Sequence, residues 1–175
     1  LVWNEDVLKL PTFMELADAG FMVCSLVFRA SNPTVEQLFE TYQATRDFVP
    51  EVVVAVGGGS ILDVGKSLCC LYGTDLPDAD SLRRLIEEKS YGHPAARWIG
   101  VPTTAGTGSE VTCWATIWDP ERDAKRSVEC RENYAFAALV DPELAAGMPV
   151  TLAVSSALDA AAHAVESYWA KGTNA

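Results

Sequence analysis

The sequence predicts an α/β fold, in which a parallel-sheet domain is followed by the start of an all-α domain. Short apolar, β-branched segments alternate with segments of helical period between residues 21 and 140, which is typical of a parallel sheet covered by helices. Two of the predicted strands lead directly into turns rich in glycine or hydroxyl side chains. From residue 149 onward only a helical period is present.

The first predicted strand covers residues 21–28. A helix is predicted over residues 35–48, with Asn32 as its cap and Pro33 at its first position. Residues 51–56 are almost entirely apolar, as expected of a strand covered on both faces.

A glycine-rich turn follows this second strand, and a helix is predicted over residues 61–72. A polar loop is predicted at 75–80 and the next strand at 98–101. Residues 111–118 and 125–130 flank a polar turn and predict a β-hairpin.

Within the hairpin, Trp114 and Trp118 are interpreted as packing residues. The last predicted strand covers residues 135–140. We expect residues 1–148 to form the α/β domain and residues 149–175 to begin the helical one. The 175 residues, 49% of them hydrophobic, are enough for one domain and part of another.

The net charge of −11 would repel phosphate backbones and anionic membrane surfaces. The longest apolar runs, such as residues 52–56, fall far below the roughly 20 residues that span a bilayer, and no signal sequence precedes them. We therefore expect a cytoplasmic protein with no nucleic-acid and no membrane partner.

The five cysteines form no CxxC pair. All except Cys130 have apolar neighbours, so buried free thiols are predicted rather than disulfides or metal ligands. The residues with such neighbours are Cys24, Cys69, Cys70 and Cys113.

The turn Gly57-Gly58-Gly59-Ser60 joins a predicted strand to a predicted helix. Glycines let the backbone approach phosphates, and a helix N-terminus favours negative charge, so this turn is a candidate pyrophosphate site. Its spacing matches neither GxGxxG nor GxxxxGK[ST], and a purely structural turn stays open as the alternative. Asp63 would repel a phosphate and is expected to orient loop amides or a ribose hydroxyl.

A second turn, residues 102–110, places four hydroxyls and two glycines between two apolar strands. Such groups suit the binding of a phosphate or a carboxamide. The alternative is that this segment is only a flexible polar turn with no ligand. Ligands of parallel sheets collect at the carboxyl ends of the strands. The two turns together therefore predict one binding site.

Asp159 and His163 lie four residues apart on a predicted helix and project from one face. A carboxylate with an imidazole suits a divalent cation such as Fe(II), Zn or Mn. An ordinary Asp–His pair that supports the helix is the alternative. Two ligands do not close a metal site.

Three segments, taken in order and spacing, resemble the iron-containing (group III) alcohol dehydrogenase family. They are GGGSILDVGK at 57–66, PTTAGTGSE at 102–110 and DAAAHAVE at 159–166. The resemblance runs from about residue 1 to residue 169. It implies a Rossmann-like parallel-sheet domain of dehydroquinate synthase-like architecture that binds NAD or NADP, followed by a helical metal-binding domain.

The resemblance also implies roles for single residues. The positions that match cofactor contacts are Asn32 at the adenosine, Gly58, Gly59 and Ser60 at the pyrophosphate, Thr103, Thr104 and Thr107 at the phosphates and nicotinamide, and Lys125. Asn4 stands where the family often has an aspartate that holds the adenosine ribose. Without that carboxylate, a preference for NAD over NADP is not implied.

Asp159 and His163 match the first two metal ligands of the family, whose metal is Fe(II), with Zn or Mn as alternatives. The family takes two further histidines from its later helices. The chain ends at Ala175 without them, so we expect an incomplete metal site and an inactive isolated chain. A second departure, Ala157 in place of a glycine, is expected to matter little.

The implied activity is metal-assisted interconversion of a small alcohol and its aldehyde by a homodimer. Residues 114–119 and 166–169 resemble the phosphonoacetaldehyde reductase branch. No acid–base residue is assigned, since His93 lies in a polar loop without motif support. One alternative is a dehydroquinate synthase-like lyase, against which both turns argue. The other is an inactive, truncated nucleotide-binding module.

Overall fold

The computed structural model describes residues 1–171, without the side chain of Ala17. The strands are β1 (Val52–Gly57), β2 (Arg97–Pro102), β3 (Trp114–Asp119), β4 (Ala124–Glu129) and β5 (Ala137–Ala138). The helices are α1 (Pro11–Asp18), α2 (Val35–Thr45), α3 (Gly59–Leu71), α4 (Ala79–Glu88), α5 (Pro142–Ala146) and α6 (Val150–Trp169). Short 3-10 turns are η1 (Val7–Lys9), η2 (Ser109–Val111) and η3 (Pro120–Arg122).

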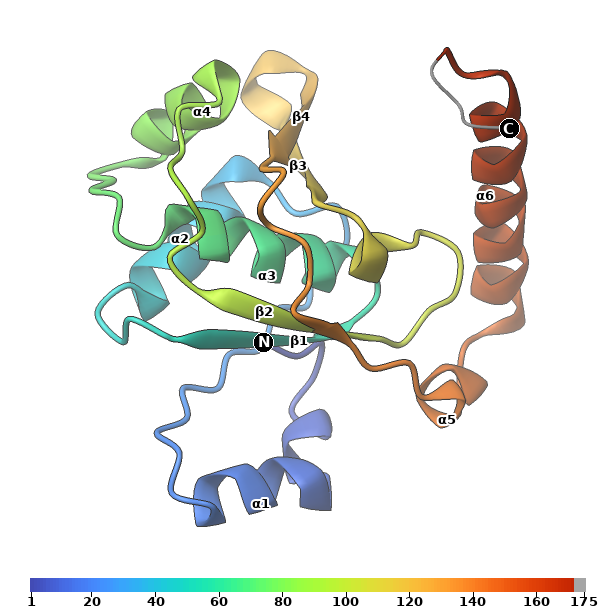
Figure 1. The fold of residues 1–175 in the computed structure, drawn as a ribbon, viewed down its shortest axis with the longest axis horizontal. Helices are drawn as coiled ribbons and strands as arrows, with labels where there is room; N and C mark the ends of the chain where they lie inside the picture. The colour runs from blue at the N-terminus through green and yellow to red at the C-terminus, as the bar shows by residue number, and fades with distance from the viewer. Residues whose placement is uncertain (172–175) are drawn as a thin grey trace.

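The parallel sheet has the strand order β1-β2-β5, and β3 pairs with β4 in a separate antiparallel hairpin. Isolated parallel bridges from Val2 to Val27 and to Val56 continue the sheet past β1. Helix α3 lies between the sheet and the hairpin, while α1 lies on the opposite side of the sheet (Figure 1). The α/β class with a parallel sheet is therefore confirmed.

Alternation along β1 explains these two layers, because successive side chains of a strand point to opposite faces. Val53 and Ala55 belong to the main core with α3, whereas Val56 packs with Val2 and Val7 on the other face. The strand thus has apolar contacts on both faces, as its sequence predicts.

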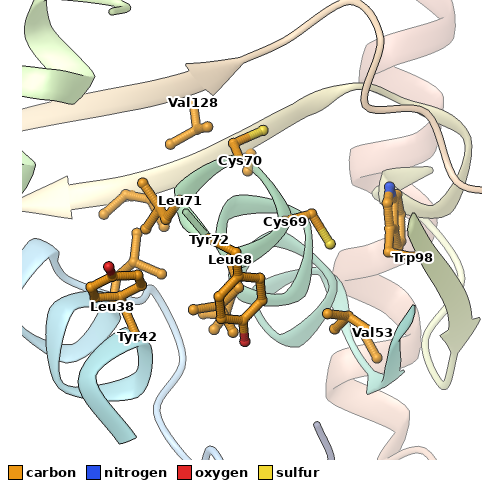
Figure 2. Close-up of a cluster of buried hydrophobic side chains, with 14 of the residues drawn as sticks. Leu38, Tyr42, Val53, Leu68, Cys69, Cys70, Leu71, Tyr72, Trp98 and Val128 are labelled. Carbon is orange, nitrogen blue, oxygen red and sulfur yellow. The ribbon is translucent and has the colours of Figure 1, made fainter. Parts of the chain in front are cut away.

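The main core is centred on α3 (Figure 2). Residues Leu68 to Leu71 of this helix are buried and pack among side chains from α2, β1, β2 and β4. Trp98 of β2 is fully buried, and its indole N–H donates to the carbonyl oxygen of Asn133 at 3.1 Å. Each large apolar side chain buried in this way contributes about 1.5–3 kcal/mol.

The strand predicted at residues 21–28 is wrong, since only Val27 forms a bridge there. Phe21 and Met22 are 66% and 87% exposed. Their apolar character suits a strand, but a strand also needs a partner, and only Val2 pairs with this segment. Cys24 is exposed in consequence, which corrects its prediction as a buried thiol, while the other four cysteines are buried.

The predicted cap of α2 is also wrong, because the cap is Thr34. The Thr34 hydroxyl accepts from the backbone N–H of Gln37, and the Gln37 side chain accepts from the N–H of Thr34. This reciprocal pair is a capping box. Asn32 instead takes a left-handed conformation with φ 54°.

Helix α4 was not predicted, and its first turn overlaps the expected loop at 75–80. Asp78 caps it by accepting from the N–H of Ser81 at 2.7 Å. Leu82 and Ile86 are buried four residues apart, and the buried Arg83 pairs with Asp119 at the end of β3. Spacing of apolar residues within this charged segment was the signal that could have revealed the helix.

The last predicted strand shortens to the two residues of β5, and α5 and α6 follow it. Helix α6 lies beyond the carboxyl ends of β1 and β2 (Figure 1). No helix within residues 1–171 is both long and apolar enough to cross a bilayer. The domain boundary near residue 148 stays a prediction.

Candidate functional site

A cleft of about 1060 Å³ lies where β1 and β2 end. Its walls come from the turns after these strands, the loop before α2, the cleft-facing side of the hairpin and one side of α6 between Leu152 and His163. Every predicted site residue except Asn4 lines it: Asn32, Gly58, Gly59, Ser60, Asp63, Thr103, Thr104, Thr107, Lys125, Asp159 and His163.

The glycine turn forms the floor of the cleft. Strand β1 ends at Gly57, Gly58 is the N-cap, and α3 begins at Gly59. The first intrahelical bonds run from the N–H groups of Ile61 and Leu62 to the Gly58 carbonyl, and no described side chain caps this end. The N–H groups of the first turn and the positive end of the helix dipole therefore favour an anion.

The two turns face each other closely. A Cβ at Gly58 would lie 3.3 Å from Thr104 Oγ1, and one at Gly59 would lie 3.0 Å from Thr107 Cγ2. The Thr103 N–H also donates to the Gly57 carbonyl at 3.0 Å. Both glycines keep the space between the turns free of side chains, which a phosphate that approaches the backbone requires.

Asp63 connects the two turns rather than pointing free into the cleft. Its Oδ1 accepts from the Ser109 hydroxyl at 2.6 Å, and its Oδ2 accepts from the Thr116 N–H at 2.8 Å. The amide that Asp63 holds belongs to strand β3 and not to a loop, so the expected role in orienting loop amides stays a prediction. A role toward a ribose hydroxyl stays a prediction.

Sequence reasoning missed Lys66. Its side chain is 0% exposed, and its Nζ donates to oxygens of Ser109, Thr112 and Trp114. Burial lowers the pKa of the Lys66 ammonium, and the Asp63 carboxylate, 3.6 Å away, opposes that shift. The available signal was a lysine on a largely apolar helix, three residues after an aspartate.

The end of the cleft near α2 combines a hydroxyl, aromatic faces and a cation. Ser60 Oγ accepts from the N–H of Asn32 at 3.1 Å, which joins the glycine turn to the loop before α2. The backbone N–H of Trp118 donates to the Pro33 carbonyl at 2.8 Å and so joins β3 to this loop. Lys125 Nζ lies 5.7 Å from the centroid of the Trp118 ring.

Trp114 and Trp118 are 52% and 39% exposed and line the cleft, so their interpretation as packing residues is wrong. They alternate along β3 with Ala115 and Ile117, which are buried. The period of two was present in the sequence, but it does not tell which face meets a core and which meets a cleft.

Asn4 lies outside the cleft. Its side-chain oxygen accepts from the N–H groups of Asp6 at 2.9 Å and Val7 at 3.3 Å, at the start of η1. Its neighbour Trp3 lines the cleft instead. The structure therefore does not bring Asn4 together with the other predicted cofactor residues.

Asp159 and His163 lie at the α6 end of the cleft. His163 Nε2 and Asp159 Oδ1 are 3.8 Å apart, and the two side chains are 56% and 45% exposed. Within residues 1–171 no group of three or more His, Cys, Asp or Glu side chains could hold a metal ion. The pair fits a divalent cation in donor type and spacing, and would supply two of its ligands.

Known proteins resemble this chain in sequence and fold. It is 37% identical over 122 residues to the phosphonoacetaldehyde reductase of Streptomyces viridochromogenes, covering 68% of this chain and 31% of that protein. It is 30% identical over 153 residues to the NADPH-dependent butanol dehydrogenase of Clostridium saccharobutylicum, covering 87% and 39%. The chain spans less than half the length of both relatives.

A solved structure shares the fold. The sulfoacetaldehyde reductase of Bifidobacterium kashiwanohense, solved in complex with NAD+, superimposes with a TM-score of 0.81 at 31% identity. The superposition covers 98% of this chain and 45% of that one. The family described as iron-containing alcohol dehydrogenase matches residues 6–142, which include both turns, and the chain therefore belongs to this family.

Proposed function

We propose that this chain forms the nucleotide-binding part of a metal-dependent oxidoreductase that uses NAD or NADP to interconvert a small alcohol and its aldehyde. The observation that carries the proposal is the close, side-chain-free approach of the glycine turn to the second turn at the uncapped start of α3. A merely structural strand-to-helix turn does not require a second hydroxyl-rich turn opposite it.

The shape of the cleft gives the cofactor a direction. The pyrophosphate would lie at Gly58 and Gly59, against the start of α3. The adenosine would extend toward Asn32, Trp118 and Lys125, where aromatic faces and a cation are exposed. The nicotinamide would lie toward Thr104, Thr107 and the α6 end. The Bifidobacterium relative was solved in complex with NAD+, which supports a nicotinamide dinucleotide as the ligand of this fold.

Asp159 and His163 would hold a divalent metal, Fe(II) first and Zn or Mn as alternatives. When bound, the nicotinamide carries the hydride and the metal polarises the carbonyl oxygen of the aldehyde. The chain's own contribution is to bring the two ends together, because Thr107 and Asp159 line the same cleft. Ser156, one helical turn before the pair, directly meets the second turn at Gly106.

The substrate is proposed to be a small aldehyde that carries an anionic group, as phosphonoacetaldehyde does. The similarity to a phosphonoacetaldehyde reductase and to a sulfoacetaldehyde reductase supports this class. A homodimer belongs to the same proposal, and sedimentation of the chain would test it.

The direct test titrates NADH and NADPH into the chain and follows nucleotide fluorescence. We expect saturable binding by the native chain and none by Gly59→Val, whose branched side chain would fill the space beside Thr107. Gly92→Val is the matched control, because a Cβ at Gly92 meets nothing within 4 Å. A folded Gly59→Val variant with native affinity would overturn the proposal. Nucleotide binding is the decisive readout, because aldehyde reduction is not expected of a chain that supplies two of the metal ligands.

A further inference from the structure

Arg83 of α4 carries a buried positive charge that binds three separate segments of the chain. Its side chain is 3% exposed, and the Asp119 side chain that it pairs with is 0% exposed. A buried charge is costly unless opposite charges and hydrogen bonds surround it. The carboxylates that pair with this guanidinium are those of Glu36, Asp80, Asp119 and Glu121.

The partners outside α4 belong to α2 and to the β3–β4 hairpin, against which α4 packs (Figure 1). Arg83 Nη2 donates to Oε1 of Glu36, in the first turn of α2, at 2.6 Å. Its Nε donates to Oδ1 of Asp119, at the end of β3, at 3.0 Å. Its Nη2 also lies 2.9 Å from Oε2 of Glu121, in the turn of the hairpin. One planar guanidinium therefore binds α2 and the hairpin together.

The same two segments form the end of the cleft that is proposed to hold the adenosine. The loop before α2 contributes Asn32, and the hairpin contributes Trp118 and Lys125, which lie opposite each other in the register of β3 and β4. Successive side chains of a strand point to opposite faces, so Trp118 lines the cleft while Asp119 is buried. Arg83 thus holds the hairpin from the face that is turned away from the cleft.

Asp119 extends this contact to the second strand of the hairpin. Its Oδ2 accepts from Arg126 Nη2 at 3.2 Å and from Arg126 Nε at 3.3 Å, and Arg126 directly follows Lys125 on β4. The Asp119 carboxylate is therefore bound to the residue beside each of the two cleft side chains, Trp118 and Lys125. A shift of Asp119 would move both of them.

Arg83 itself does not contact a ligand in the cleft. Neither its side chain nor those of Glu36 and Asp119 line the cavity. Any effect of Arg83 on binding must therefore pass through the hairpin and the loop before α2. The backbone bond from the Trp118 N–H to the Pro33 carbonyl joins these two segments and reports on their spacing.

We propose that Arg83 is a positioning residue that holds the hairpin and the loop before α2 at the spacing that the adenosine half of the nucleotide requires. This inference rests on the proposed function. Without the guanidinium, Asp119 and Glu36 would lose the group that binds both of them. The two walls of the adenosine end could then separate, while the glycine turn and the second turn keep their places.

The first test compares Arg83→Met, which removes the charge but keeps a long side chain, with Leu82→Ala. Leu82 precedes Arg83 on α4, is fully buried and does not line the cleft, so it controls for lost stability. ADP-ribose, which lacks the nicotinamide, is titrated beside NADH. We expect Arg83→Met to raise both Kd values at least fivefold, and Leu82→Ala to leave them unchanged at a similar loss of Tm. A folded Arg83→Met variant with native Kd values would overturn the proposal.

Amide hydrogen exchange gives a readout that does not need a nucleotide. The Trp118 N–H, bonded to the Pro33 carbonyl, should exchange at least fivefold faster in Arg83→Met than in Leu82→Ala when the two variants have the same Tm. Equal exchange rates would show that Arg83 contributes only to overall stability.

A milder pair of variants keeps the test decisive if Arg83→Met does not fold. Glu36→Ala removes the α2 partner of the guanidinium, whereas Glu40→Ala removes the same charge from an exposed position one turn later on this helix. We expect Glu36→Ala to raise the Kd for ADP-ribose about threefold and Glu40→Ala to leave it unchanged. Equal Kd values in the two variants would overturn the proposal.

The two proposals can fail separately. If the native chain binds neither NADH nor NADPH, the proposed function fails. The exchange rate of the Trp118 amide, measured without nucleotide, still decides whether Arg83 holds the hairpin against the loop before α2.

Discussion

A Cβ added to Gly106 would lie 2.4 Å from the carbonyl oxygen of Ser156, so α6 reaches the cleft only because position 106 has no side chain. Gly106 also has φ +141°, a conformation that residues with a side chain rarely adopt. The contact places the helix that carries Asp159 and His163 against the second turn.

Gly106→Ala should therefore displace α6 from the cleft. We expect the free energy of unfolding to fall by about 1–3 kcal/mol, from backbone strain and the clash together. Chemical denaturation would measure it, with Gly92→Ala as the control, because a Cβ at Gly92 meets no atom within 4 Å. Equal stability of the two variants would show that α6 does not depend on this contact.

Cofactor choice should depend on Lys125 and not on Asn4. Asn4→Asp is expected to leave the ratio of NADPH to NADH affinity unchanged, because the side chain lies at η1 outside the cleft. Lys125→Ala should weaken NADPH more than NADH by about tenfold, the equivalent of one charge-assisted hydrogen bond. Fluorescence titrations with both nucleotides would decide. If only Asn4→Asp changed the ratio of NADPH to NADH affinity, position 4 and not position 125 would determine the cofactor preference.

The metal pair should bind a divalent cation weakly. Two ligands from one helix are fewer than the three protein ligands that catalytic sites generally use. We expect calorimetry with Zn(II) to detect binding that is lost on desalting and in the Asp159→Ala, His163→Ala double variant. Glu166→Gln, on the same helix, should behave as the native chain. Stoichiometric metal retained after desalting, or binding that survives the double variant, would contradict the assignment.

One thiol of the five should react rapidly with Ellman's reagent in the native protein. Cys24 is exposed, while the other four are buried. Burial raises the pKa of Cys69 to about 12 and raises that of Cys70 as well, so their reactive thiolates are scarce at neutral pH. Cys24→Ser should abolish the fast phase, and denaturant should release the remaining four thiols. A second fast thiol would show that the core around α3 opens readily.

Local patterns determined much of this protein. The apolar run before Gly57, the helical period after Gly59 and the hydroxyl-rich turn after β2 predict the parallel sheet and the two walls of the cleft. The spacing of Asp159 and His163 predicts their shared face on α6. Such features could be predicted because backbone period, glycine freedom and helix spacing act over a few residues.

Tertiary structure decided the rest, because contacts between distant segments depend on packing that no local period records. Residues 21–28 have the composition of a strand, but only one residue of this segment pairs with another part of the chain. The two tryptophans of the hairpin face a cleft instead of the core. The Asn4 side chain binds the backbone N–H groups of Asp6 and Val7 instead of facing the cleft. Lys66 finds its four acceptors more than 40 residues away. A buried ammonium is stable only where folding brings such oxygens together, so its role becomes visible only in three dimensions.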